Sequence, residues 1–86
     1  MISFEAYKTL SQDLQAEILW QFGVYLDLVR TTPRRCIELY ALDNFYVEMH
    51  FSKKTEEPLF LRPLNKTKDL EPYLRLIEID SLLETK

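Results

Sequence analysis

The chain has 86 residues, 47% of them hydrophobic and 13% aromatic, and a formal net charge of −3 at pH 7. This composition predicts one small globular domain over residues 1–86 and argues against a disordered tail. The acidic balance argues against nucleic acid or an anionic membrane as a partner, since both select basic surfaces. No apolar run approaches the length of a membrane span.

Cysteine usage and the first residues bear on the cellular compartment. Cys36 is the one cysteine of the chain, so no intrachain disulfide can form. The N-terminal residues are acidic and do not have the basic and apolar segments of a secretory signal. Both observations predict a cytoplasmic location.

Two helices are expected before the first strand. Ser3 is the expected N-cap of a short helical turn within residues 3–10, and Ser11 is the expected N-cap of a second helix that ends at Phe22. Gly23, the one glycine of the chain, follows that helix. We therefore expect Gly23 to adopt the left-handed conformation that commonly ends a helix.

Trp20 lies outside the apolar stripe of the second helix, which consists of Leu14, Ile18 and Phe22 and is widened by Leu19. Two interpretations of Trp20 are open: a contact for the first helix, or an exposed aromatic side chain.

Four strands are expected next, at residues 24–31, 35–42, 45–52 and 59–64. Asp43 and Asn44 link the second and third strands, and both residue types tolerate positive φ, which predicts a two-residue type I′ hairpin. Asp69 is the expected N-cap of a final helix with Pro72 in its first turn. That helix is expected to carry Leu70, Tyr73, Leu74 and Ile77, with a loose turn at 80–83 after it. The predicted fold is α+β: an N-terminal helix, a four-stranded antiparallel meander in order 1-2-3-4, and a short C-terminal helix.

The hairpin predicts which side chains share a face of the sheet, because successive residues of a strand point to opposite faces. We call the two faces A and B. Face A carries Cys36, Glu38, Tyr40, Leu42, Phe45, Val47, Met49 and Phe51. Face B carries Ile37, Leu39, Ala41, Tyr46, Glu48 and His50. Both sets are partly apolar, so terminal segments or another molecule must cover what the helices leave open.

The first candidate site is a polar cluster on face B. It consists of His50, Glu48, Arg62 and Tyr46. A histidine with an orienting carboxylate and an anion-binding arginine could support acid–base chemistry. The residues favour the other interpretation, a cross-strand ion pair with His50 at the sheet rim, because no second ligand or nucleophile accompanies the histidine.

The second candidate is the turn that carries Arg30, Arg34 and Arg35. Three arginines could bind a phosphate or an acidic protein partner. The alternative, which the residues favour, is a solvated turn whose charges discourage edge pairing of strands.

Metal, cofactor and nucleophile motifs are not expected in this chain. Asp27 and Glu38 share face A and would repel each other if directly opposite, but no ligand loop accompanies them. Cys36 is expected to be a small buried hydrophobe. We therefore predict no metal site and no cofactor.

Three segments carry a resemblance to a known group of proteins. They are ELYALDNFYVE at 38–48, LRPL at 61–64 and LEPYL at 70–74. In this pattern the chain resembles a group of small uncharacterised bacterial proteins from the long helix to its end. The resemblance implies a compact helix–meander–helix domain and no assigned activity.

The sequence thus predicts an interaction or regulatory module without catalysis, which self-associates as a homodimer through sheet or helix surface. Two alternatives stay open. One is a small-ligand pocket between helices and sheet, lined by Tyr25, Tyr40 and Trp20. The other is an undescribed enzyme that uses His50, Glu48 and Arg62.

Overall fold

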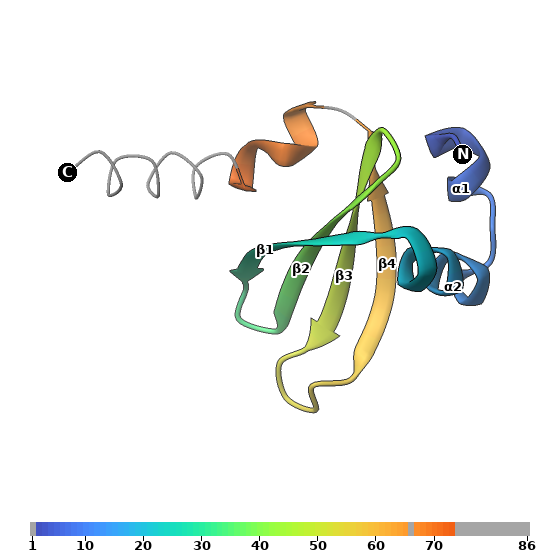
Figure 1. The fold of residues 1–86 in the computed structure, drawn as a ribbon. Helices are drawn as coiled ribbons and strands as arrows, with labels where there is room; N and C mark the ends of the chain where they lie inside the picture. The colour runs from blue at the N-terminus through green and yellow to red at the C-terminus, as the bar shows by residue number, and fades with distance from the viewer. Residues whose placement is uncertain (1, 66, 74–86) are drawn as a thin grey trace.

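The computed structural model describes residues 2–65 and 67–73 (Figure 1). Its elements are α1 (Phe4–Lys8), α2 (Gln12–Phe22), β1 (Val24–Thr31), β2 (Arg35–Leu42), β3 (Phe45–Ser52), β4 (Pro58–Leu64) and the 3-10 helix η1 (Thr67–Leu70). Residues 71–73 are α-helical. The strands form one antiparallel sheet in the order β1-β2-β3-β4, so the predicted α+β fold and strand order are confirmed. The expected positions of Leu74, Ile77 and the turn at 80–83 lie outside the described residues.

Both predicted serine caps are present. Ser3 Oγ accepts a hydrogen bond from the Ala6 amide at 3.2 Å, and Ser11 Oγ accepts one from the Leu14 amide at 3.3 Å. Each bond satisfies one of the amides that a helix start leaves without an intrahelical partner. In the part of the chain that the structure describes, no helix is long and apolar enough to cross a membrane.

Gly23 ends α2 in a different way from the one expected. Its φ of −73° and ψ of 150° are extended, so the predicted left-handed conformation is wrong. The Gly23 amide donates to the Leu19 carbonyl at 2.8 Å. A Cβ at this position would lie 2.5 Å from that carbonyl oxygen and 2.7 Å from a methyl carbon of the Leu19 side chain. Glycine is required here by close approach and not by positive φ.

The β2–β3 hairpin has the predicted register, with Leu42 opposite Phe45 and the pairing unbroken to Arg35 and Ser52. The turn itself differs from the prediction. Asp43 has a φ of 52° and Asn44 does not have positive φ, whereas a type I′ turn needs both.

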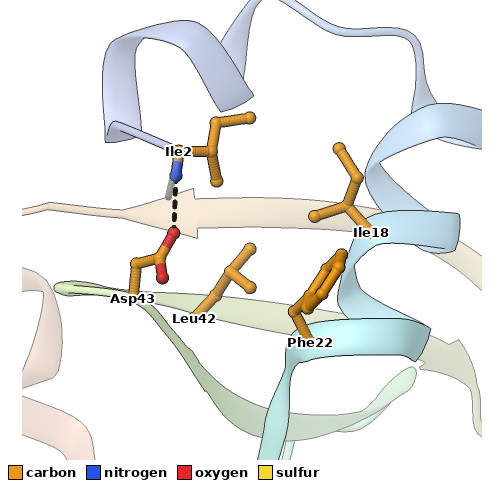
Figure 2. A pocket seen from close by; sticks show the side chains of 5 residues that line it. All are labelled: Ile2, Ile18, Phe22, Leu42 and Asp43. Atoms are coloured by element: carbon orange, nitrogen blue, oxygen red, sulfur yellow. Dashed lines mark hydrogen bonds between the residues drawn. The ribbon is translucent and has the colours of Figure 1, made fainter.

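The tip of this hairpin is joined to the N-terminal segment. Asp43 Oδ2 accepts a 2.7 Å hydrogen bond from the Ile2 amide (Figure 2). Beside that bond, Ile2, Ile18, Phe22 and Leu42 surround a cavity of about 230 Å³. The bond holds α1 against the sheet at the end where α2 leads into β1.

β1 contains an irregularity that the sequence pattern does not reveal. Tyr25 pairs with Tyr40 and Leu28 with Leu39, so the two residues between Tyr25 and Leu28 have no cross-strand partner. One of them, Asp27, has a φ of 56°. This β-bulge places Val29 opposite Glu38, so Asp27 and Glu38 are not directly opposite each other. Among the described residues no cluster of potential metal ligands is present.

Each face of the sheet has its own core. Helices α1 and α2 cover part of face A, where the buried residues are Tyr7, Leu19, Leu42, Phe45, Val47 and Leu61. The C-terminal segment covers part of face B, where Leu39, Leu64 and Tyr73 form a buried hydrophobic cluster. Figure 1 shows the two helices and η1 on different sides of the sheet. Terminal segments therefore provide part of the cover that apolar residues on both faces require.

Candidate functional site

The polar cluster of face B is centred on the carboxylate of Glu48. This side chain is 1% exposed and lies in the middle of β3, directly opposite Arg62 of β4. His50 Nε2 lies 2.9 Å from Oε1, and Arg62 Nη1 lies 3.6 Å from the same oxygen. Tyr73 donates to Oε2 at 2.7 Å, and Arg30 Nη2 donates to it at 3.3 Å. Both oxygens are therefore satisfied by side chains from four segments of the chain.

These contacts keep Glu48 ionised. Burial by itself raises the pKa of a carboxyl group, because it disfavours the charged form. The hydrogen bonds from Tyr73 and His50 and the charge of Arg30 outweigh burial, so the pKa of Glu48 lies below its ordinary value. Glu48 is thus a buried anion held by its neighbours.

His50 is buried, and the expectation that it lies at the sheet rim is wrong. Its side chain is 5% exposed. The cause is Phe60, which pairs with His50 across the β3–β4 ladder and stacks on the imidazole at a centroid distance of 4.3 Å. His50 Nδ1 is buried and has no hydrogen-bond partner among the described residues.

The sequence predicted part of this cluster correctly. It grouped Glu48, His50 and Arg62, which the structure brings together. Tyr46 lies on the same face but packs against the apolar core of face B, and the structure shows no hydrogen bond from its hydroxyl to described residues. Two members were missed, Arg30 and Tyr73. Strand alternation places Arg30 on face B and could have revealed it, whereas no local signal pointed to Tyr73.

The arginine turn and the polar cluster form one site. A cavity of about 440 Å³ lies over face B at the β1–β2 turn, and we call it the arginine cavity. It is lined by Arg30, Arg34, Arg35, Arg62, His50, Thr32, Pro33 and Ile37. Four of the chain's five arginines therefore meet at one place, and no acidic residue of the described chain lines it. These residues lie close together because the β1–β2 turn is at the same end of the sheet as His50.

The cavity arginines differ in how firmly they are held. Arg30 contacts Glu48, and its guanidinium lies over the ring of Tyr73 at 5.5 Å from the centroid. It is thus part of the Glu48 network and not a solvated turn residue. The Arg35 guanidinium lies over the ring of Phe60 at 5.0 Å. Arg34 and Arg35 are exposed, and within the described part of the chain neither makes an ion pair.

Positive charge dominates the lining of the arginine cavity, which suits the binding of an anion. A histidine–carboxylate pair that activated a nucleophile of the protein would need that nucleophile beside the imidazole. Thr32 is the one hydroxyl residue among those that line the cavity, and its Oγ1 accepts the Arg35 amide within the turn at 3.0 Å. Cys36 lies in β2 next to Ile37 and therefore points to the other face. The positive charge of the lining is the dominant chemical feature.

A second, apolar cavity of about 670 Å³ lies on face A, and we call it the aromatic groove. Its lining comes from α2 and all four strands and consists of Ala16, Leu19, Trp20, Gly23, Tyr25, Tyr40, Met49, Phe51 and Pro58. Trp20 is 88% exposed at the groove, which decides between the two interpretations of this residue in favour of an exposed aromatic. Tyr25 and Tyr40 lie beside each other with a centroid distance of 5.3 Å.

Tyr40 marks the polar end of the aromatic groove. Its hydroxyl donates to Glu38 Oε1 at 3.0 Å. Partial burial, followed by this bond to a carboxylate, raises the pKa of Tyr40 to about 12. The hydroxyl therefore stays protonated at physiological pH and acts as a donor.

Comparisons of the chain with protein-family models, with curated proteins and with solved structures gave no match.

Proposed function

We propose that the protein is an interaction module without catalysis that self-associates through the aromatic groove. The observation that carries this proposal is the position of Trp20, a tryptophan 88% exposed at an apolar cavity of about 670 Å³. A monomeric protein seldom leaves a large aromatic side chain so exposed beside an apolar hollow. One surface therefore carries both a protruding side chain, Trp20, and an apolar groove that can receive such a side chain.

A two-fold dimer can form through this surface alone. In a two-fold interface, the same patch of each subunit contacts the other, so a protrusion on one copy must meet a hollow on the other. Trp20 of each copy would enter the groove of its partner, beside Tyr25 and Phe51. An aromatic side chain buries about 150–250 Å², which corresponds to roughly 4–6 kcal/mol of gross hydrophobic free energy per Trp20. The hydrophobic free energy of two such side chains is comparable to the entropic cost of association.

We also propose that the protein is cytoplasmic and of bacterial origin. A chain with one cysteine and no disulfide suits a reducing cytoplasm. The resemblance described above supports a bacterial protein of this type, and both statements stay predictions.

Light scattering coupled to size-exclusion chromatography over a dilution series tests self-association. The expected result is twice the 10.3 kDa mass of the chain at the higher concentrations. Trp20 is the one tryptophan of the chain, so its fluorescence emission should shift to shorter wavelength as the dimer forms. Trp20→Ala should abolish the dimer and keep the fold. Leu14→Ala is the matched control, because Leu14 is an exposed apolar residue of α2 that does not line the groove.

A 10.3 kDa mass at every concentration, with unchanged tryptophan emission, would overturn the proposal. In that case a second function has support from the volume of the aromatic groove, which lies within the range of small-molecule pockets. A small apolar ligand with one group that accepts from Tyr40 would fit. Native mass spectrometry of the purified monomer would then reveal a co-purified small molecule.

A further inference from the structure

We propose that the arginine cavity binds a small phosphorylated molecule through its phosphate group. This inference concerns face B and is independent of the association proposed for the aromatic groove. It is carried by the charge of the lining, by two buried nitrogen atoms without partners, and by the size of the cavity.

The charge of the cavity is unbalanced. Four arginines line it, and in the part of the chain that the structure describes the one carboxylate in contact with them is that of Glu48 beneath. Four positive charges against one negative charge leave a surplus of three, on a protein whose net charge is −3. Arg34 and Arg35 contribute two of these charges, and among the described residues neither has an acidic partner. A bound anion would relieve the repulsion among these guanidinium groups.

Two buried nitrogen atoms in the lining residues have no hydrogen-bond partner within residues 2–65 and 67–73. They are His50 Nδ1 and Arg30 Nε. Unpartnered buried polar atoms are rare, because each costs free energy relative to its hydrated state. Arg30 Nε is a donor, and His50 Nδ1 is also a donor when the imidazole is protonated, with Nε2 then donating to Glu48. An anion in the cavity supplies an acceptor for Arg30 Nε, and for His50 Nδ1 in the protonated imidazole.

Phosphate matches this arrangement better than a single carboxylate does. The four arginines come from β1, the β1–β2 turn, β2 and β4, so they surround the cavity rather than form one pair. Guanidinium groups donate in forks that fit the several oxygens of a phosphate. A cavity of about 440 Å³ lies within the size range of small-molecule sites. Four arginines in one hollow also neutralise too few phosphates to hold duplex DNA.

Isotope-edited NMR with inorganic pyrophosphate as the probe tests the proposal. The expected result is saturable shifts of the Arg34, Arg35 and His50 signals at millimolar pyrophosphate or below, with affinity that falls as salt rises. Arg34→Gln should weaken binding about tenfold, because it removes one charge-assisted donor pair. Lys8→Gln is the matched control, because it removes one positive charge from α1 and should leave the affinity unchanged.

Thermal unfolding without ligand should give the same midpoint for wild type and Arg34→Gln, since Arg34 is exposed and makes no ion pair within the described chain. Equal weakening by Lys8→Gln and Arg34→Gln would overturn the proposal, because it would show diffuse charge attraction. So would the absence of saturation at millimolar pyrophosphate. Tighter binding of citrate would assign the cavity to carboxylates, and submicromolar binding of duplex DNA would assign it to nucleic acid; either result would overturn the proposal.

Discussion

The hydroxyl of Tyr73 donates a 2.7 Å hydrogen bond to the buried carboxylate of Glu48, which lies 25 residues earlier in the chain. This bond joins the helical residues after η1 to the middle strand β3. The same carboxylate is in contact with His50 and Arg30, which both line the arginine cavity. The C-terminal segment thus helps to position the residues of that cavity.

Tyr73→Phe removes this bond and keeps the aromatic ring. Hydrogen bonds to charged groups contribute about 1.5–3 kcal/mol, so we expect the free energy of unfolding to fall by that amount. Urea denaturation provides the measurement. Tyr46→Phe is the control on the same face, because no hydrogen bond joins its hydroxyl to the described residues, and its effect should be much smaller. Equal effects of the two variants would contradict a role for the Tyr73–Glu48 bond.

The lowered pKa of Glu48 predicts how stability depends on pH. Below its ordinary pKa of 4.5, the unfolded chain binds this proton more readily than the folded protein does. The stabilisation from Glu48 is therefore fully present above that pH and is lost as pH falls through the folded-state pKa. The denaturation midpoint should therefore fall as pH is lowered through the acid range. This fall should be shallower in Glu48→Gln than in the wild-type protein. Glu17→Gln, which removes an exposed carboxylate of α2, is the control. An equal change of slope in both variants would show that Glu48 is not the group responsible.

Gly23→Ala should destabilise the protein although the backbone at Gly23 is extended. At an extended position without steric conflict, Gly→Ala stabilises by about 0.4–1 kcal/mol. Here the new Cβ would meet the backbone oxygen of Leu19 at 2.5 Å, so we expect a loss of roughly 1–3 kcal/mol. Gln21→Ala, at an exposed position of α2, gives the baseline for a substitution near the helix end. A gain in stability for Gly23→Ala would contradict the close approach.

His50→Ala should lower the free energy of unfolding by roughly 2 kcal/mol or more, because it removes the stack on Phe60 and the bond to Glu48 and leaves a cavity. A histidine at the exposed sheet rim would instead give only a small loss of stability. Lys54→Ala in the exposed β3–β4 loop provides the baseline for a surface substitution. A loss of stability no larger than that baseline would be inconsistent with a packed imidazole.

The elements and the sheet register could be predicted from the sequence because their causes are local. A serine before a helical stripe supplies an N-cap, and a two-residue link leaves one register for the strands it joins. Alternation then assigns Glu48, His50 and Arg62 to one face with no knowledge of the rest of the fold. The stripe of Leu14, Ile18 and Phe22 does not mark the buried face of α2, because Leu14 and Phe22 are exposed, whereas Leu19 is buried.

The tertiary structure decided the features that depend on contacts between distant segments. The bulge at Asp27 changes the cross-strand partner of Glu38. The alternation of apolar and polar residues in β1 does not predict this bulge. Phe60 buries His50 only because β4 lies beside β3, and Tyr73 reaches Glu48 only because the C-terminal segment returns to face B. The arginine cavity forms where the β1–β2 turn meets strand β4. Side-chain periodicity records which face a residue occupies, whereas burial and partners depend on which other segment packs against that face.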